Sequence, residues 1–373
     1  MIRFLTVFLP CENIHLTKDV GMIPYMFHKK YNYNSTIASY KNGEYPYLNT
    51  EVKGLNQVFI QRRFKSDFLN SVYFILKNFK QYDVIQLYHF SFKNLFILYL
   101  FKLLNFNNAK VRVYLKMDQN DNVKNIKISK FRNWQYKFLL NKIDLISLET
   151  ELLYRFTQKT QFLNGKIKLI PNGFYDNEVK PNLKVIKKEN YILTVGLIGD
   201  KNKSNEILLE AFALLPEEYG DWKLQLAGKV IPEFSSYLEN YFARFPQLKG
   251  RIEFLGFISD KSVLDTLYEK AKIFVLTSKA ESFGIVFLEA IKFGCTLVSS
   301  AITPAYDVTH NERYGKLFEI DNVEDLVLKL KMVIENLDIN ENYNPSIIQN
   351  FAYSKFYWPQ IISRIKQDLK IQE

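Results

Sequence analysis

The sequence predicts an α/β protein of two domains, each built around a parallel sheet with helices on both faces. Three observations lead to this expectation. The chain has 373 residues, which is enough for two hydrophobic cores. Short apolar runs alternate with amphipathic segments along most of it, as in βαβ units. A polar, lysine-rich stretch, NEVKPNLKVIKKEN (177–190), separates the two halves and predicts a linker.

The first half carries the pattern less regularly than the second. It runs through RFLTVFL (3–9), FLNSVYFILKNF (68–79), VIQLYHF (84–90), VRVYLKM (111–117), DLISLE (144–149) and KIKLIPN (166–172). The N-terminal apolar run is shorter than a signal peptide needs, so we expect a buried first strand. The stretch LFILYLFKLLNF (95–106) is interrupted by Lys102 and is too short to span a bilayer.

The second half shows the alternation clearly. Strands are expected at YILTVGLI (191–198), WKLQLAG (222–228), RIEFLGF (251–257), KIFVLTS (272–278) and TLVSS (296–300), and helices at NEILLEAFALL (205–215), FSSYLENYFARF (234–245), SVLDTLYEKA (262–271), FGIVFLEAIKFG (283–294) and VEDLVLKLKMVIENL (323–337). These strands are continuously apolar because a parallel sheet is covered on both faces.

Charge is distributed unevenly between the halves. Residues 1–190 hold 30 Lys and Arg against 14 Asp and Glu, a net charge of +16, whereas residues 191–373 carry −5. The basic half also interleaves aromatic residues with cations, as in FRNWQYKFLLNK (131–142). Such a surface suits nucleic acid, an anionic membrane or an anionic substrate. The alternative is that the positive charge reflects a composition biased toward lysine, but such a bias should affect the second half as well.

Two glutamates eight positions apart mark the candidate site, in ESFGIVFLEA (281–290). The segment follows an expected strand and leads into a helix that should begin near Gly284. Ligands of doubly wound folds bind beyond the carboxyl ends of strands, where loops lead into helices. The free N–H groups of Phe283, Gly284 and Ile285, together with the helix dipole, would form an anion site suited to a diphosphate.

The two carboxylates can flank one ligand at this place. Glu281 precedes the anion site, and Glu289 lies about one and a half turns into the helix with its side chain leaning back toward the N-terminus. Carboxylates accept hydrogen bonds from vicinal hydroxyls, which suggests a hexose at Glu281 and a ribose at Glu289. The alternative is that both glutamates lie on a solvated helix face.

ESFGIVFLEA resembles the glutamate-x7-glutamate motif of the retaining nucleotide-sugar glycosyltransferases of family four, which have the GT-B fold. Four further segments are similar to that family: LIPNGF (169–174), VGLIGDKNKSNEILLEAF (195–212), RIEFLGFIS (251–259) and FYWPQIISRIKQDL (356–369). The resemblance implies two Rossmann-like domains facing a central cleft. We expect an N-terminal acceptor domain at 1–180, a donor domain at 187–355, and a last helix within 356–373 that returns to the first domain.

The resemblance also implies roles for residues outside the glutamate motif. In the donor domain, Gly196 and Lys203 would meet the donor diphosphate, and Phe257 would follow the strand that meets the nucleobase. The family usually has an Arg where this chain has Leu197. In the acceptor domain, Gly21 stands for the family's glycine loop. His89 would contact the donor sugar, and Asp118 would bind acceptor hydroxyls or steady a developing charge.

For His89 and Asp118 a structural role, as a rim histidine or a turn cap, is the alternative. We expect no metal and no other cofactor, because DQND (118–121) is the nearest approach to a metal motif and a polar loop explains it equally well.

The function expected from the resemblance is transfer of a sugar from a nucleotide-diphosphate sugar, with a UDP-sugar favoured, to a glycan or lipid-diphosphate-linked acceptor. The basic first half would dock on the inner face of a bacterial membrane during polysaccharide, lipopolysaccharide or glycolipid synthesis. The two cysteines, Cys11 and Cys295, fit a reducing cytoplasm. A catalytically weak GT-B binding or scaffold protein is one alternative. A nucleic-acid-binding protein is the other, although no nucleic-acid module is recognisable.

Overall fold

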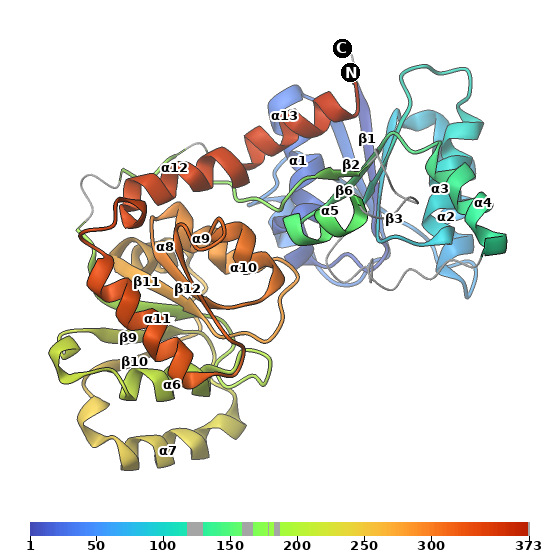
Figure 1. Ribbon diagram of the computed structural model, residues 1–373. Coiled ribbons are helices and arrows are strands. Elements are labelled where there is room, and N and C mark those ends of the chain that lie inside the picture. Colours follow the sequence, from blue (N-terminus) through green and yellow to red (C-terminus); the bar gives the residue numbers. More distant parts are fainter. Residues whose placement is uncertain (118–129, 159–166, 178, 183–186, 372–373) are drawn as a thin grey trace. The chain divides into compact units, whose positions relative to one another are not determined.

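The computed structural model describes residues 1–117, 130–158, 167–177, 179–182 and 187–371 (Figure 1). Their contacts define two compact units, of which the first comprises Met1–Tyr175 with Phe356–Glu373 and the second Asp176–Lys355. The first unit thus ends five residues before the expected 180. The linker expected at 177–190 is too long, because a strand of the second unit already begins at Glu189.

The first unit contains a seven-stranded sheet in which every pairing is parallel, in the order β3-β2-β1-β4-β5-β6-β7. Its strands are β1 (Arg3–Val7), β2 (Asn34–Ser39), β3 (Asn56–Phe59), β4 (Val84–Tyr88), β5 (Arg112–Lys116), β6 (Leu145–Leu148) and β7 (Ile167–Leu169). Its helices are α1 (Asp19–Tyr31), α2 (Asp67–Asn78), α3 (Phe92–Leu104), α4 (Lys130–Leu140), α5 (Glu151–Gln158) and α13 (Trp358–Asp368).

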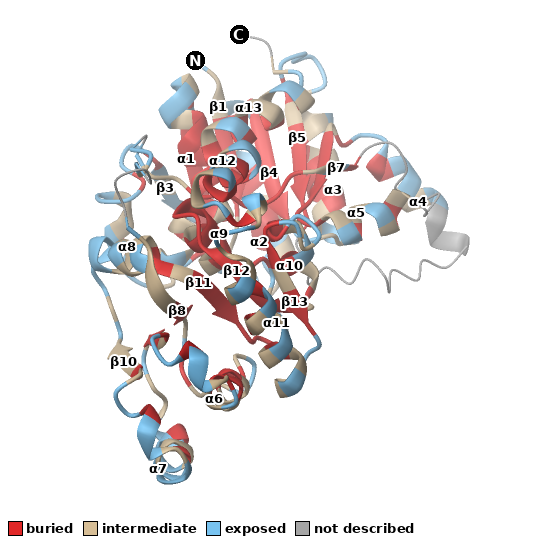
Figure 2. Cartoon of the chain, turned by 60° about the vertical axis from the view of Figure 1, so that its left-hand side comes forward, coloured by how far each residue is buried: buried red, intermediate tan, exposed pale blue. Residues whose placement is uncertain are grey.

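Successive strand residues of this sheet face two separate cores. Leu5 and Val7 of β1 lie in a core with residues of α2 and α3, whereas Phe4 lies in a core with residues of α1 and α13. This follows from the two-residue period of a strand, and it explains why the strands are apolar throughout. Figure 2 shows the result, with buried strands in red and the outer sides of helices in pale blue.

The chain returns to the first unit at its C-terminus. The amide of Phe174 donates to the carbonyl of Phe356 at 2.9 Å, and the amide of Trp358 donates to the carbonyl of Phe174 at 3.1 Å. A Cβ atom at Gly173 would lie only 2.6 Å from the Phe356 carbonyl oxygen, so the close approach of the two segments requires a glycine. The expected return of residues 356–369 therefore forms α13 against α1 (Figure 1).

The second unit contains a six-stranded parallel sheet in the order β10-β9-β8-β11-β12-β13. Its strands are β8 (Glu189–Val195), β9 (Lys223–Ala227), β10 (Ile252–Gly256), β11 (Ala271–Leu276), β12 (Thr296–Ser300) and β13 (Gly315–Phe318). Its helices are α6 (Asn205–Ala213), α7 (Ser235–Arg244), α8 (Lys261–Lys270), α9 (Ile285–Lys292), α10 (Thr303–Val308) and α11 (Val323–Asn336), followed by α12 (Pro345–Phe356), whose last residue belongs to the first unit.

Both sheets reverse their strand order once. In the first unit the chain builds outward from β1 to β3 and then starts again on the other side of β1 with β4. In the second unit it builds from β8 to β10 and starts again beside β8 with β11. The crossovers at a reversal leave on opposite faces of the sheet, which opens a crevice at the carboxyl edge where ligands bind. Each unit therefore has one such place, between β1 and β4 and between β8 and β11.

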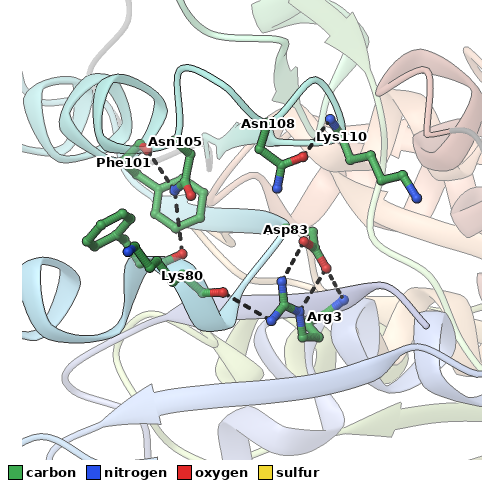
Figure 3. A network of polar contacts seen from close by, with 8 residues as sticks. Arg3, Lys80, Asp83, Phe101, Asn105, Asn108 and Lys110 are labelled. Atoms are coloured by element: carbon green, nitrogen blue, oxygen red, sulfur yellow. Dashed lines mark hydrogen bonds and ion pairs between the residues drawn. The ribbon is translucent and has the colours of Figure 1, made fainter.

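An ion pair joins β1 to the residue before β4 at the opposite, amino edge of the first sheet (Figure 3). The Arg3 guanidinium donates from Nε to Asp83 Oδ2 at 3.0 Å and from its second amino group to Oδ1 at 2.8 Å. The Arg3 amide also donates to Asp83 Oδ2 at 3.0 Å. Burial alone would raise the pKa of Asp83, but the hydrogen bonds from Arg3 hold that pKa below its usual range.

We predict that Asp83→Asn lowers the free energy of unfolding at pH 7 by about 1 kcal/mol, because the Arg3 side chain is 39% exposed and solvent screens the pair. A carboxyl with a lowered folded-state pKa contributes stability above its unfolded pKa and loses it as pH falls through the folded one. The difference should therefore shrink below about pH 4 in urea titrations. Glu44→Gln, in an exposed pair with Lys41, should change little. A difference between wild type and Asp83→Asn that is constant with pH would contradict this account.

Candidate functional site

The loops that follow β8 and β11 are hydrogen-bonded together at the reversal of the second sheet. The Asn202 side chain donates to the carbonyl of Ala280 at 2.9 Å and accepts from the amide of the same residue at 3.1 Å. The amide of Lys279 donates to the Asn202 carbonyl at 2.8 Å. The Thr277 hydroxyl donates to the carbonyl of Lys203 at 2.7 Å. These contacts fix the backbone of both loops at the carboxyl edge of the sheet.

Lys203 and Glu281 face each other across this junction. The Lys203 ammonium donates to Glu281 Oε1 at 2.5 Å, and their side chains are 23% and 16% exposed. The sequence placed these residues on one ligand, the lysine at the diphosphate and the glutamate at the sugar. The structure brings them together as an ion pair. An anionic ligand that binds Lys203 must therefore compete with the Glu281 carboxylate.

The helix α9 begins at this junction with its first amides free. Gly284 is its N-cap residue and has φ 77°, a left-handed conformation that favours glycine. The amides of Gly284, Ile285 and Val286 donate to no acceptor in the part of the chain that the structure describes. The Phe283 side chain is 2% exposed and anchors the loop in the core. The amide groups and the dipole of α9 can bind an anion here.

Glu289 lies on α9, half-buried, and accepts a hydrogen bond from the Tyr268 hydroxyl at 2.9 Å. Burial raises the pKa of Glu289, although the Tyr268 hydrogen bond and nearby lysines act in the opposite direction. An ionised Glu289 therefore costs the folded protein free energy. A carboxylate kept at such a cost is typical of functional sites.

Three glycines end the neighbouring strands β8, β9 and β10. The Gly196 amide donates to the carbonyl of Ala227 at 3.0 Å, and the Gly228 amide donates to the carbonyl of Gly256 at 2.8 Å. A Cβ atom at Gly228 would lie 1.6 Å from the Gly196 carbonyl oxygen, so no other residue fits there. A Cβ atom at Gly196 would lie 3.6 Å from Lys203 Cε, so the lysine stem passes over this glycine. The result is a floor of bare backbone beside Lys203.

Sequence reasoning named Gly196 but missed Gly228 and Gly256. Their signal was present, because each glycine comes at the end of an apolar run, in WKLQLAG and RIEFLG. Phe257 comes next after Gly256, and its side chain is 78% exposed. Leu197, where the similar family usually has an arginine, is 41% exposed. Both side chains are thus accessible to a ligand at the carboxyl edge.

The first-unit candidates lie in different surroundings. His89 directly follows β4, is exposed and has φ 66°, and its amide donates to the carbonyl of Lys116 at 3.0 Å. Gly21 is not in a loop: it lies buried in α1, where a Cβ atom would lie 2.1 Å from the Leu16 carbonyl oxygen. This packing by itself requires a glycine at position 21. Asp118 lies outside the described residues.

A buried charged cluster at the same edge of the first sheet was not foreseen. Lys116, which ends β5, is 1% exposed and lies 3.0 Å from Asp19 at the start of α1. It also donates to Glu149, which follows β6. Burial alone would lower the pKa of Lys116, but the two carboxylates raise it above its usual value, so the ammonium stays charged. Its partners are far apart in sequence, which is why no local motif indicates the cluster.

Part of this chain is similar in sequence to known glycosyltransferases. Residues 176–349 match the family model described as glycosyl transferases group 1. The chain is 31% identical over 166 residues to an uncharacterized glycosyltransferase of Haemophilus influenzae, covering 44% of this chain and 45% of that protein. It is 26% identical over 212 residues to an alpha-1,4-N-acetyl-D-galactosaminyltransferase of Campylobacter jejuni, covering 54% and 55%. The chain thus spans about half the length of these curated relatives.

The fold is similar over the whole chain to a solved structure, HepE of Anabaena in complex with UDP and glucose. The TM-score is 0.67 at 16% identity, with 99% of this chain and 100% of that chain covered. The architecture is therefore the GT-B fold, two Rossmann-like units each with a parallel sheet. The segment that matches the glycosyl transferases group 1 lies wholly within the second unit of this chain.

We predict that Glu289→Gln stabilises the unliganded protein at pH 7, because glutamine can still accept the Tyr268 hydroxyl without a buried charge. A raised folded-state carboxyl pKa favours folding below the unfolded pKa, and this contribution is lost as pH rises through the folded one. The variant's advantage in urea titrations should therefore be largest near pH 7 and disappear below about pH 4. Glu239→Gln, at an exposed position on α7, should leave stability unchanged at both pH values. Loss of stability in Glu289→Gln at pH 7 would overturn this interpretation.

Proposed function

We propose that the chain is a retaining glycosyltransferase that moves a sugar from a nucleoside-diphosphate sugar, with a UDP-sugar favoured, to a glycan or lipid-diphosphate-linked acceptor. The observation that carries the proposal is the convergence of Lys203 with the free amides at the start of α9, beside a floor of bare backbone. A diphosphate needs both a cation and N–H donors, and this arrangement supplies them at one edge of the sheet.

The proposed donor site uses the residues in distinct roles. The diphosphate accepts hydrogen bonds from the amides of Phe283, Gly284 and Ile285. It also binds the Lys203 ammonium in place of the Glu281 carboxylate. The freed Glu281 carboxylate then accepts hydrogen bonds from hydroxyls of the transferred sugar. Glu289 accepts hydrogen bonds from the ribose hydroxyls. These add to the Tyr268 hydrogen bond and stabilise the negative charge of Glu289. The solved structure of HepE with UDP and glucose supports a UDP-sugar as donor.

The proposed reaction needs no protein nucleophile. The bond between the anomeric carbon and the diphosphate oxygen breaks, and the negative charge that develops on the diphosphate is stabilised by Lys203 and the α9 amides. The acceptor hydroxyl attacks from the face that the diphosphate leaves, which retains the anomeric configuration. Its proton passes to the departing phosphate oxygen. The part of Glu281 is to position the sugar, and a small displacement of a bound substrate costs much in rate.

The proposed acceptor site lies on the first unit. His89 contacts the sugar as it is transferred, and Asp118 remains assigned to acceptor hydroxyls. The name of the Campylobacter jejuni relative specifies a glycan on PP-undecaprenol, which supports a lipid-diphosphate-linked acceptor. Among the described residues no helix is both long and apolar enough to cross a bilayer.

A surface of α3 and α4 suits contact with a lipid-linked acceptor. It exposes Trp134 and Phe138 on α4, which are 62% and 45% exposed, and Phe106 just beyond α3, which is 77% exposed. Lys142 lies with its ammonium 5.7 Å from the centre of the Phe138 ring. Aromatic side chains beside cations are typical of proteins that bind at a membrane interface. We propose that this surface docks on the inner face of an anionic membrane.

We predict that Lys203→Ala weakens UDP binding about ten- to a hundredfold in isothermal titration, because one charge-assisted hydrogen bond is worth about 1.5–3 kcal/mol. Lys249→Ala is the matched control, since this exposed lysine lies just before β10, at the amino edge of the same sheet. Glu281→Gln should act in the opposite sense, leaving UDP binding equal or tighter while UDP-sugar turnover falls. Unchanged UDP affinity in Lys203→Ala would refute the proposed diphosphate site and favour a non-catalytic protein.

We predict that the protein sediments with vesicles that contain anionic lipid and that binding fades as salt rises, because each Lys or Arg near such a surface contributes about 1 kcal/mol. The double variant Trp134→Ser with Phe138→Ser should bind several-fold more weakly. Ile339→Ser, at a 75% exposed position of the second unit, controls for the loss of an exposed apolar side chain. Recovery of the wild type in the supernatant at low salt would exclude the membrane surface.

A further inference from the structure

The first unit has a hollow at its own strand reversal. It has a volume of about 400 Å³ and is bounded by residues 7–10, which end β1 and follow it, and by Tyr88 and His89 at the end of β4. The N-termini of α2 and α3 form its other side. Ligand pockets of proteins have volumes of about 300–1,000 Å³, and the strand reversal is where they are expected.

Two lysines line this hollow without partners. Lys65 precedes α2 and Lys93 lies in the first turn of α3, and both are exposed. Neither ammonium has a hydrogen bond or ion pair with any described residue. Other cations of this unit are already engaged, as Arg3 is with Asp83 and Lys102 is with Asp144. The pair is therefore available to an anion from solution.

Backbone amides converge on the same place. The first two amides of α2 and the first two of α3 donate to no acceptor within the described residues. Both helices exceed eleven residues, so each brings a full dipole with its positive end at the hollow. The caps Ser66 and Ser91 satisfy amides further along, those of Leu69 at 3.5 Å and Asn94 at 3.1 Å.

The largely buried side chain of Ser71 gives independent support for a ligand. Ser71 of α2 lines the hollow and is only 5% exposed, yet its hydroxyl has no hydrogen-bond partner among the described residues. Serines in helices commonly bond back to the preceding turn. The Ser71 hydroxyl makes no such bond and remains available to a ligand in the hollow.

One carboxylate shares the hollow and is held from its other side. Asp67 is the first residue of α2 and accepts the Tyr40 hydroxyl on Oδ1 at 2.7 Å. The Arg62 guanidinium lies 4.1 Å from the centre of the Tyr40 ring, which places a further cation close behind. With two free lysines against one engaged carboxylate, the lining stays positive.

We propose that this hollow binds a phosphoryl group of the acceptor substrate. Lys65 and Lys93 supply the charge, and the α2 and α3 amides together with Ser71 supply hydrogen bonds to the phosphoryl oxygens. His89 lies at the same hollow, so a bound phosphate is held beside the residue proposed to contact the transferred sugar. The assignment of the phosphate to the acceptor rests on the proposed function. The presence of the anion site does not.

The test measures binding of inorganic pyrophosphate to the full chain by isothermal titration in saturating UDP, which keeps the donor site occupied. We expect binding by the wild type, at least tenfold weaker binding by Lys65→Gln with Lys93→Gln, and a smaller loss in Ser71→Ala. Lys110→Gln is the matched control and should equal the wild type, because this exposed lysine precedes β5 at the amino edge of the sheet. The UDP titration described above tests the donor site independently. Failure of the proposed function would therefore show in that titration, whatever the pyrophosphate result.

A second measurement distinguishes a lipid-borne phosphate from a soluble one. Phosphatidylcholine vesicles doped with a polyprenyl diphosphate are compared with vesicles that carry the same charge as phosphatidylserine. For a lipid-linked acceptor we expect preference for the diphosphate vesicles, which pyrophosphate and the double lysine variant both abolish. For a soluble sugar phosphate we expect equal binding to the two kinds of vesicle, while pyrophosphate still binds as described above. Absence of pyrophosphate binding to the wild type, or equal binding to the double lysine variant, would overturn the proposal.

Discussion

The reversal of strand order in each parallel sheet is the constraint on which both proposed sites depend. Because β8 has β9 on one side and β11 on the other, the loops that follow β8 and β11 leave the sheet toward opposite faces and meet only at its carboxyl edge. Asn202 joins the two loops through hydrogen bonds to Ala280. Only in this arrangement can Lys203 and Glu281, which are 78 residues apart, form one ion pair. The same reversal between β1 and β4 opens the hollow in the first unit.

At the carboxyl edge of the second sheet, the charged side chains can exchange their present partners for a ligand. Lys203 is neutralised by Glu281, while burial raises the pKa of Glu289 and so penalises its charge. A ligand with a diphosphate and sugar hydroxyls can relieve both conditions, since its anion replaces Glu281 on the lysine and its hydroxyls solvate the carboxylates. The unliganded site is thereby less stable than its residues could make it, as is common where binding has to release free energy.

The sequence predicted those features that depend on neighbouring residues. The alternation through the second half located its strands well, because strands buried on both faces are continuously apolar. The segment ESFGIVFLEA located the start of α9 to within a residue or two for the same local reason. In contrast, β2 carries the polar run NSTIAS and β13 is only GKLF, so neither has a pattern that indicates a strand. The assignment of Gly21 to a glycine loop was wrong, because its packing against Leu16 depends on the turn before α1. The Lys116 cluster and the phosphate hollow depend on residues that only the sheet brings together.

We propose that a nucleotide sugar binds with its diphosphate between Lys203 and the first amides of α9. A crystal structure of the chain with UDP-glucose tests this most directly. It should show the diphosphate within hydrogen-bonding distance of the Gly284 and Ile285 amides and of the Lys203 ammonium, with Glu281 released from the lysine and contacting the sugar. Density for the nucleotide elsewhere, with the Lys203–Glu281 ion pair still closed, would contradict the account.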